Sequence, residues 1–171
     1  MILLETDRLF IERFTEEDAP FMLDLLNMPT WIQNIGDRGV RTVDEARQYI
    51  LNGAIKSYEQ LGFGPYRVTL KANGQPIGLC GLFKREALDD VDIGFAFLPD
   101  YSGAGYGYES ASAIMKYAGN QLGLTRITGL TTATNHASIR LLEKLGLRFE
   151  KVILFREDSI ESLLYGVTLD K

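Results

Sequence analysis

Residues 101–108 constrain the fold of this 171-residue chain most, because glycines at positions 103, 105 and 107 separate two segments of different character. Residues 91–98 are short and mainly apolar, which predicts a strand, and residues 106–122 predict a helix. In such a unit, unpaired backbone N–H groups at the start of the helix face the carboxyl end of the strand, where anions bind. The loop therefore predicts a phosphate-binding site or, alternatively, only close packing of strand and helix.

Two common phosphate loops do not fit these glycines. A P-loop needs a Lys directly after its last glycine, and no Lys follows Gly107. The dinucleotide pattern Gly-x-Gly-x-x-Gly, started at Gly103, places Tyr108 where its last glycine belongs. That pattern also needs an acidic residue about 20 residues further on, and residues 124–128 contain none. A phosphate site here must therefore belong to another class of loop.

The remaining pattern predicts hairpins on both sides of this unit. Alternating and β-branched runs predict about seven strands, at residues 9–14, 66–70, 76–83, 91–98, 125–132, 149–155 and 159–169. Helical spacing and two capping boxes predict about four helices, near residues 21–26, 42–62, 106–122 and 136–145. Residues 31–41 are expected to form a loop, and Asn73-Gly74 predicts a tight hairpin turn. Together these elements predict an α+β fold with a mixed, mostly antiparallel sheet whose last two strands are antiparallel.

Length and composition favour one globular domain, residues 1–171, since a typical domain has ~150 residues. Hydrophobic residues make up 46% and charged residues 24%, which argues against disorder. The net charge of −5 argues against a nucleic acid as the main partner. No apolar run is long enough for a signal peptide or a membrane span, so no membrane partner is expected. The single cysteine, Cys80, excludes an internal disulfide and favours a reducing, cytoplasmic location.

Several blocks of the sequence, in chain order, resemble one family. The pattern Ser102-x-x-Gly105-x-Gly107 resembles the Arg/Gln-x-x-Gly-x-Gly/Ala pyrophosphate loop of the GNAT (Gcn5-related N-acetyltransferase) superfamily, with Ser102 replacing the leading Arg or Gln. Other blocks are similar to its ribosomal-protein N-acetyltransferase (RimJ/RimL-type) branch, at residues 4–9, 15–19, 93–101, 105–110, 135–138 and 143–146. The resemblance covers nearly the whole chain and implies a single GNAT domain.

The resemblance implies transfer of an acetyl group from acetyl-CoA to an amine by direct attack within a ternary complex. It implies that backbone N–H groups hold the pyrophosphate at Gly103, Ala104, Gly105, Tyr106, Gly107 and Tyr108. The peptide-like pantetheine arm would pair with the strand end at Phe97 and Leu98, and an N–H near Phe97 would polarise the thioester carbonyl. Asn135 and Ser138 match the family's second cofactor segment, although both residue types also suit helix capping.

The attacking amine must lose a proton, because α-amines with a pKa of ~8 and lysine amines with a pKa of ~10.4 are mostly protonated at neutral pH. Asp92 lies on the strand before the loop, near where several family members carry a basic carboxylate; the alternative is an exposed strand residue. The tyrosine that many members use to protonate the thiolate is missing, so Ser138 is the remaining hydroxyl. Glu109, in the first helical turn, is expected to complement the helix dipole.

Other reactive or aromatic residues are weaker candidates for catalytic or binding roles. Cys80 lies in an apolar run and is expected to fill the core, and His136 is expected at the surface of a first helical turn. Trp31, Tyr66 and Phe83 are candidates for the acceptor cleft, although most of them could equally belong to the core. No metal site is expected.

The sequence therefore predicts an N-acetyltransferase, monomeric or homodimeric, that uses acetyl-CoA. Its acceptor is a protein or peptide N terminus or a small amine, and the acidic net charge favours a cationic acceptor. Two alternatives remain at this stage. One is a non-catalytic acyl-CoA-binding sensor, and the other is a nucleotide-binding domain.

Overall fold

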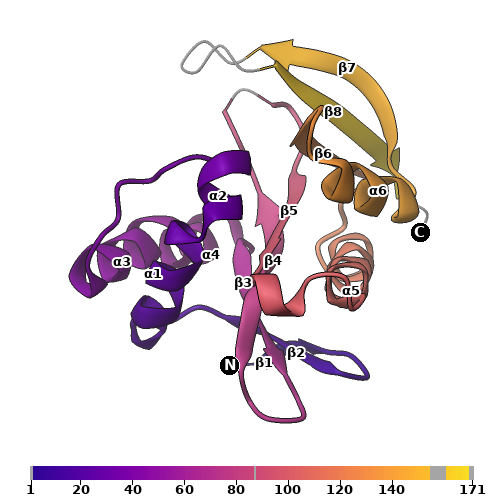
Figure 1. The fold of residues 1–171 in the computed structure, drawn as a ribbon. Helices are drawn as coiled ribbons and strands as arrows, with labels where there is room; N and C mark the ends of the chain where they lie inside the picture. The colour runs from indigo at the N-terminus through magenta and orange to yellow at the C-terminus, as the bar shows by residue number, and fades with distance from the viewer. Residues whose placement is uncertain (1, 87, 155–160, 170–171) are drawn as a thin grey trace.

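The computed structural model describes residues 2–86, 88–154 and 161–169 (Figure 1). Within these residues, eight strands form one sheet in the order β1-β2-β3-β4-β5-β6-β8-β7. Their bounds are β1 Ile2–Glu5, β2 Leu9–Arg13, β3 Pro65–Leu70, β4 Pro76–Phe83, β5 Asp92–Phe97, β6 Arg126–Thr132, β7 Arg148–Leu154 and β8 Glu161–Thr168. Every pairing is antiparallel except that between β5 and β6. The predicted α+β fold with a mixed, mostly antiparallel sheet is confirmed.

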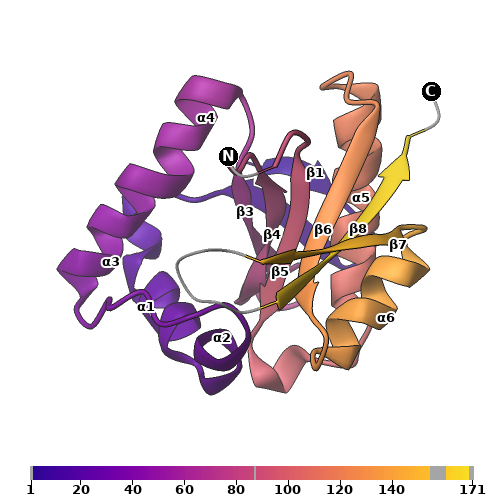
Figure 2. The ribbon, with the colours of Figure 1, turned by 90° about the horizontal axis from the view of Figure 1, so that it is seen from above.

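Helices cover both faces of this sheet (Figure 2). One face carries α1, α2, α3 and α4, and the other carries α5 and α6. Their bounds are α1 Ala19–Asn27, α2 Pro29–Asn34, α3 Val43–Ile50, α4 Lys56–Leu61, α5 Tyr106–Asn120 and α6 His136–Lys144. A π-helical segment, Leu51–Ile55, joins α3 to α4. Apolar side chains from both helical layers meet the sheet in the core.

The long predicted helix at residues 42–62 is confirmed as the continuous run from α3 to α4. The Thr42 side chain accepts a hydrogen bond from the Glu45 backbone N–H at 3.1 Å, which caps the first turn. Gly62 ends the run with φ = 80°, a left-handed conformation that other residues adopt only at a cost.

Three local predictions need correction. Strand β1 was not predicted, because this edge strand is only four residues long and has β2 as its single neighbour. Residues 31–41 are not wholly a loop, since Trp31 belongs to α2, which starts with Pro29 in its first turn. The connection at Asn73-Gly74 is wider than a tight hairpin and takes up residues 71–75, with the Gly74 N–H bonded to the Leu70 carbonyl at 2.9 Å.

The two last predicted strands, 149–155 and 159–169, correspond to β7 and β8. They pair antiparallel as predicted, and β8 also pairs with β6. The predicted strand ends at Phe155 and Ser159 lie outside the described residues.

The parallel pair β5–β6 determines where the sheet opens. In the described residues, these two strands pair at a single position, Asp92 opposite Thr128. On its other edge, β5 stays paired with β4 to its end, and the Leu98 N–H donates to the Ile77 carbonyl at 2.9 Å. Because backbone groups alternate in direction along a strand, the N–H of Phe97 points the other way, toward the side from which β6 has diverged. The end of β5 therefore presents a strand edge next to the start of α5.

Candidate active site

The glycine loop presents backbone donors at the start of α5. Gly103 and Gly105 have φ of 80° and 86°, so both adopt the left-handed conformation that favours glycine. The first hydrogen bond of the helix runs from the Glu109 N–H to the Gly105 carbonyl at 3.0 Å. The N–H groups of residues 106–108 therefore have no acceptor within the helix and carry its partial positive charge. This geometry suits a pyrophosphate without any Lys or Arg.

The third glycine of the loop, Gly107, has a different physical role. A Cβ at this position would lie 3.0 Å from Leu141 Cδ2 of α6 and 3.6 Å from Phe97 Cε2. Close packing of α5 against α6 and the end of β5 therefore leaves a side chain here too little room unless Leu141 shifts. The close-packing interpretation thus applies to Gly107, and the phosphate-binding interpretation depends on Gly103 and Gly105.

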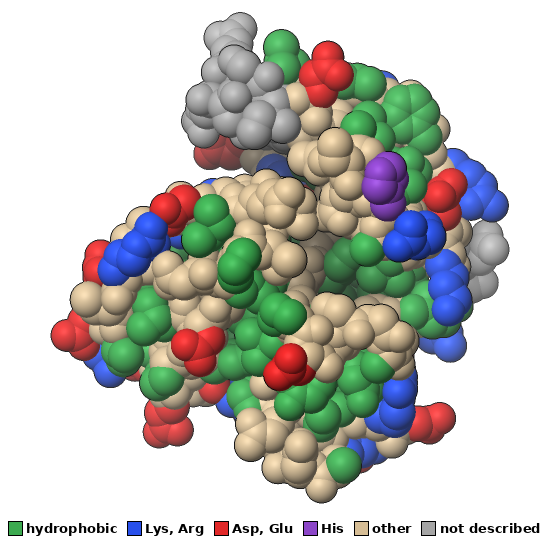
Figure 3. Space-filling view, in the orientation of Figure 1, with side chains coloured by type: hydrophobic (Ala, Val, Ile, Leu, Met, Phe, Trp, Pro, Cys, Tyr) green, Lys and Arg blue, Asp and Glu red, His purple; other side chains and the backbone are tan. Residues whose placement is uncertain are grey.

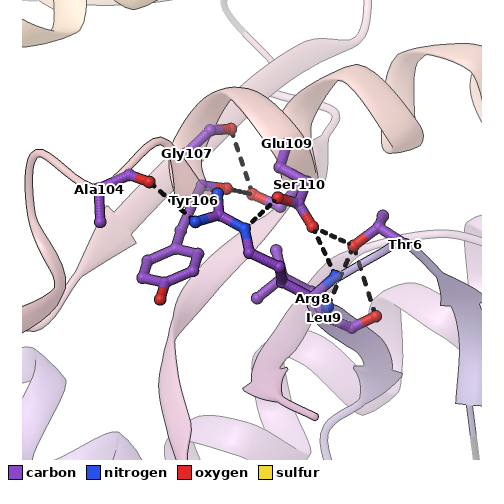
Figure 4. A network of polar contacts seen from close by, with 8 residues as sticks. All are labelled: Thr6, Arg8, Leu9, Ala104, Tyr106, Gly107, Glu109 and Ser110. Carbon is purple, nitrogen blue, oxygen red and sulfur yellow. Dashed lines mark hydrogen bonds and ion pairs between the residues drawn. The ribbon is translucent and has the colours of Figure 1, made fainter. Parts of the chain in front are cut away.

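A polar network ties this loop to the turn between β1 and β2 (Figure 4). The Glu109 carboxylate accepts hydrogen bonds from Thr6 Oγ1 at 2.5 Å, from the Arg8 backbone N–H at 3.0 Å and from Arg8 Nε at 2.7 Å. Arg8 also donates to the Ala104 carbonyl at 3.1 Å, and its guanidinium lies 4.3 Å from the centre of the Tyr106 ring. Arg8 thus connects the loop to a segment about a hundred residues earlier in the chain.

Glu109 therefore does more than complement the helix dipole. Burial alone would raise the pKa of the Glu109 carboxyl, but the hydrogen bonds from Thr6 and Arg8 outweigh burial and hold that pKa below its ordinary value. The carboxylate stays ionised at neutral pH and fixes the first turn of α5. Sequence reasoning noted residues 4–9 as a family block but gave Arg8 no role, because the contact exists only in the folded chain.

A cavity of about 1070 Å³ runs from this loop across the open end of the sheet to α2 and α4. Figure 3 shows a hollow at the centre of the molecule, with hydrophobic side chains inside it and Lys or Arg side chains on its right-hand rim. The lining includes most of the predicted site residues, namely Trp31, Phe83, Asp92, Phe97, Gly103, Gly105, Tyr106, Gly107, Tyr108, Asn135 and Ser138. Residues that are far apart in sequence are thus brought to one cavity.

Asp92 lies at the start of β5 and is 1% exposed, so it is not the exposed strand residue that was weighed as an alternative. Arg85 Nε lies 3.2 Å from Asp92 Oδ1 and 3.3 Å from Oδ2. Burial raises the pKa of the Asp92 carboxyl above its ordinary value, and the Arg85 guanidinium opposes that rise without cancelling it. A carboxylate with a raised pKa is a stronger base than an exposed one.

The aromatic candidates separate into two groups. Trp31 is 5% exposed and lines the cavity from α2, and Phe83 lines it from β4. Tyr66 is fully buried, stacks on Tyr58 with ring centres 5.6 Å apart and is not among the cavity-lining residues. Tyr66 points to the core face of β3, which corrects its prediction as an acceptor-cleft residue.

The second predicted cofactor segment forms the start of α6. The Asn135 side chain accepts a hydrogen bond from the Ser138 backbone N–H at 3.3 Å and so caps the helix. Ser138 supplies this cap only through its backbone, and its side chain lines the cavity. The capping alternative therefore applies to the Asn135 side chain and not to the Ser138 hydroxyl.

Two predicted cofactor residues stand outside the cavity lining. The Leu98 N–H is engaged by the Ile77 carbonyl, so it is not available to a ligand. The carbonyl of Ala104 is engaged by Arg8. The Leu98 N–H is thus not among the backbone groups that the strand end can offer to the pantetheine arm, and Phe97 is the residue whose N–H faces the opening.

Cys80 and His136 lie as expected. Cys80 is fully buried, and burial raises the pKa of its thiol to about 12, which disfavours a thiolate nucleophile. His136 is exposed in the first turn of α6. In the described ranges, no three His, Cys, Asp or Glu side chains gather closely enough to hold a metal ion. None of the helices that the structure describes combines the length and hydropathy needed to cross a bilayer.

The open parallel pair, the glycine loop and the shared cavity together define an α+β protein whose cavity adjoins the free N–H groups at the start of α5. The chain belongs to the acetyltransferase (GNAT) domain family, whose model matches residues 8–148. This match confirms the predicted family and its acetyltransferase class.

Individual relatives agree with this assignment. The uncharacterized N-acetyltransferase YoaA of Bacillus subtilis is 28% identical over 153 residues, which cover 88% of this chain and 85% of that protein. A GNAT-family acetyltransferase from Bacillus anthracis has a TM-score of 0.80 at 24% identity and covers 98% of both chains. RimL, a ribosomal L7/L12 alpha-N-protein acetyltransferase solved in complex with coenzyme A, has a TM-score of 0.84 at 17% identity and covers 99% of both chains. The two structures establish a shared fold.

Proposed function

We propose that this protein transfers the acetyl group of acetyl-CoA directly to a primary amine. The observation that carries the proposal is the single cavity that joins the backbone donors of α5 to the buried carboxylate of Asp92. Acetyl-CoA supplies the activated acetyl group as a thioester. Membership in the GNAT family and the RimL structure with coenzyme A support this choice of donor.

Different residues of the chain have different roles in the proposed reaction. The N–H groups at the start of α5 hold the pyrophosphate, and the free edge of β5 near Phe97 pairs with the peptide-like arm. The Phe97 N–H donates to the thioester oxygen, which becomes more negative as the amine attacks. The ammonium first loses a proton, which passes through a chain of water molecules to Asp92, and the free amine then attacks.

The bond changes balance as follows. The amine nitrogen forms the C–N bond, the C–S bond breaks, and the electron pair of that bond stays on the sulfur. The nitrogen then loses its second proton, which ends on the thiolate to give free CoA thiol. A thiol of this kind has a pKa of ~8.5, so the thiolate needs only modest help to leave. The Ser138 hydroxyl, which has no other role in the helix cap, donates a hydrogen bond to it.

A non-catalytic acyl-CoA sensor is the second candidate. Two observations favour it: residues 139–142 carry no tyrosine, and both carboxylate oxygens of Asp92 face Arg85. A sensor would bind acetyl-CoA and never release its thiol.

One pair of measurements separates these outcomes. Acetyl-CoA at 100 times its dissociation constant should stabilise the fold by ~2.7 kcal/mol, which a melting-temperature scan detects. Release of free CoA thiol is then measured across a panel of amines and N-terminal peptides. Binding with turnover supports the enzyme, and binding without turnover of any acceptor supports the sensor. The absence of any shift in melting temperature, or tighter binding of ATP or NAD, refutes the proposed cofactor.

A further inference from the structure

The charges on the cavity wall are opposite in sign to those of the whole chain. The sequence contains 18 Lys and Arg and 23 Asp and Glu, so the protein is acidic overall. Among the described residues that line the cavity, Asp92 is the one carboxylate. The basic lining residues are Arg38, Lys56, Lys84, Arg85, Arg140 and Lys144. The cavity lining therefore carries a surplus of positive charge in a protein whose net charge is −5.

These basic residues fall into two groups by position. Arg140 and Lys144 lie on α6 next to the glycine loop, and Lys144 Nζ is 4.3 Å from the centre of the Tyr108 ring. They belong to the half of the cavity that the proposed function gives to the phosphates of acetyl-CoA. The other four basic residues come from different elements and need another explanation.

The second group lines the part of the cavity near Trp31 and Asp92, which the proposed function leaves for the acceptor and which we call the acceptor half. Arg38 follows α2, the helix that carries Trp31, and Lys56 starts α4 on the same face of the sheet. Lys84 and Arg85 follow β4, next to Asp92. The acceptor half thus has a surplus of positive charge even after Arg85 is paired with Asp92.

The pairing of these cations matters for what they can bind. Arg85 is engaged by Asp92, and Lys84 Nζ donates to the backbone carbonyls of Arg85 and Leu88. Within the part of the chain that the structure describes, Arg38 and Lys56 form no ion pair. A cationic acceptor would be repelled by these like charges. A carboxylate or phosphate would be attracted to Arg38 and Lys56, whose N–H groups could donate hydrogen bonds to it.

We infer that the acceptor is a small amine that also carries an anionic group, a carboxylate or a phosphate. The amine lies toward Asp92, and the anionic group lies toward Arg38 and Lys56. This inference rests on the proposed function and reverses the preference for a cationic acceptor that the net charge suggested. The net charge of the whole sequence does not report the charge of the residues that line the cavity.

The test uses matched acceptors that differ in the anionic group. L-phenylalanine is compared with L-phenylalaninamide, phosphoethanolamine with ethanolamine, and spermidine serves as the cationic case. The values of kcat/KM for thiol release are compared per unprotonated amine, because the amines of each pair differ in pKa. We expect the anionic member of at least one pair to be preferred roughly tenfold or more, as for a charge-assisted hydrogen bond. The pair with the larger preference distinguishes carboxylate from phosphate.

Variants then locate the preference in the cavity. The double variant Arg38→Gln/Lys56→Gln should lower the preference for the anionic acceptor toward one and leave the neutral acceptor nearly unaffected. Lys116→Gln/Lys151→Gln removes the same charge outside the cavity and should leave the preference unchanged. A preference for the neutral or cationic acceptors, or an equal loss in both double variants, overturns the inference.

A second readout does not depend on turnover. Trp31 is the single tryptophan of the chain and lines the cavity, so its fluorescence reports ligand binding there. In the presence of CoA, the anionic amine of each pair should bind more tightly than its neutral partner. If this holds without thiol release, the acetyl-transfer proposal fails and the anion site stands. If thiol is released while fluorescence and rate favour neutral amines, the anion site fails and the acetyl transfer stands.

Discussion

Replacing Asp92 with Asn tests the proposed base directly. The carboxylate is 1% exposed and lies 3.2 and 3.3 Å from Arg85 Nε. Asparagine keeps the shape of the side chain and one oxygen for Arg85, but it cannot accept a proton. The substitution therefore removes the proton transfer while it keeps the packing at the start of β5.

The size of the effect follows from the protonation of the acceptor. At pH 7, about 10% of an α-amine with a pKa of ~8 is unprotonated, and about 0.04% of a lysine amine with a pKa of ~10.4. General base catalysis typically contributes ~10²–10⁴-fold. We expect Asp92→Asn to lower kcat at pH 7 by roughly 100-fold or more and to leave the Kd of acetyl-CoA nearly unchanged.

The pH dependence of the activity gives a second test of Asp92 as the base. Burial raises the pKa of Asp92, so activity of the native protein should fall with decreasing pH through a pKa above that of an ordinary aspartate. The variant lacks this limb and depends on free amine. Its rate should rise about tenfold per pH unit up to the pKa of the amine, so the gap to the native protein narrows as pH rises.

The assay is thiol release from acetyl-CoA between pH 5 and 10 with the best acceptor of the panel. Asp90→Asn is the matched control, because Asp90 lies two residues before Asp92 in the connection that leads into β5, is paired with Arg126 at 3.0 Å and does not line the cavity. Equal kcat for Asp92→Asn and the native protein at every pH refutes the base assignment. An equal loss in Asp90→Asn assigns the effect to the connection and not to the proton transfer.

Three further predictions address the cofactor half of the site. Ser138→Ala keeps the backbone N–H that completes the α6 cap and should lower kcat about tenfold, less than the ~10²–10⁴-fold typical of acid assistance because a thiolate leaves readily; an unchanged kcat removes the hydroxyl from the mechanism. Glu109→Gln should weaken acetyl-CoA binding about tenfold in titration calorimetry, since it removes a charged acceptor of three hydrogen bonds that fixes the loop; equal affinity shows that the loop holds its shape without the charge. Gly107→Ala should destabilise the protein by ~1–3 kcal/mol through overpacking against Leu141, whereas Gly119→Ala in the same helix, with its nearest neighbour at 3.7 Å, should stabilise it by up to ~1 kcal/mol; equal shifts in both variants contradict the packing argument.

The parts of the fold that local chemistry determines were predictable from the sequence. The Thr42 cap and Gly62 bound the α3–α4 run, and the spacing of Gly103 and Gly105 marks the start of α5. Strand β1 was missed because an edge strand of four residues is stabilised by its pairing with β2 more than by its own pattern. Tyr66 was misplaced because an aromatic residue on a strand gives no sign of which face it occupies until the sheet is assembled.

The ion pairs of the site could not be predicted from the sequence, because they too depend on how the sheet is assembled. Arg8 and Glu109 are 101 residues apart, and no local pattern signals that the β1–β2 turn meets the first turn of α5. Arg85 and Asp92 are separated by seven residues in a connection without regular spacing. Both pairs bring a cation to a carboxylate, and both become visible only when the sheet topology is known.

The topology also separates the proposed cofactor contacts from the proposed acceptor contacts. Hairpins join most neighbouring strands, but the chain passes from β5 to β6 through α5, so the parallel pair, the free strand edge and the helix start occur at the same place. In the proposed function, phosphate binding, pairing with the pantetheine arm and polarisation of the thioester would all use backbone N–H groups, which tolerate sequence change. The fold itself is shared at identities of 24% and 17%, with TM-scores of 0.80 and 0.84. Acceptor choice has no such backbone basis in our proposal, which assigns it to side chains such as Trp31, Arg38 and Lys56. Specificity should therefore change by substitution of these residues without loss of acetyl-CoA binding, and a variant that loses both together would contradict this division of roles.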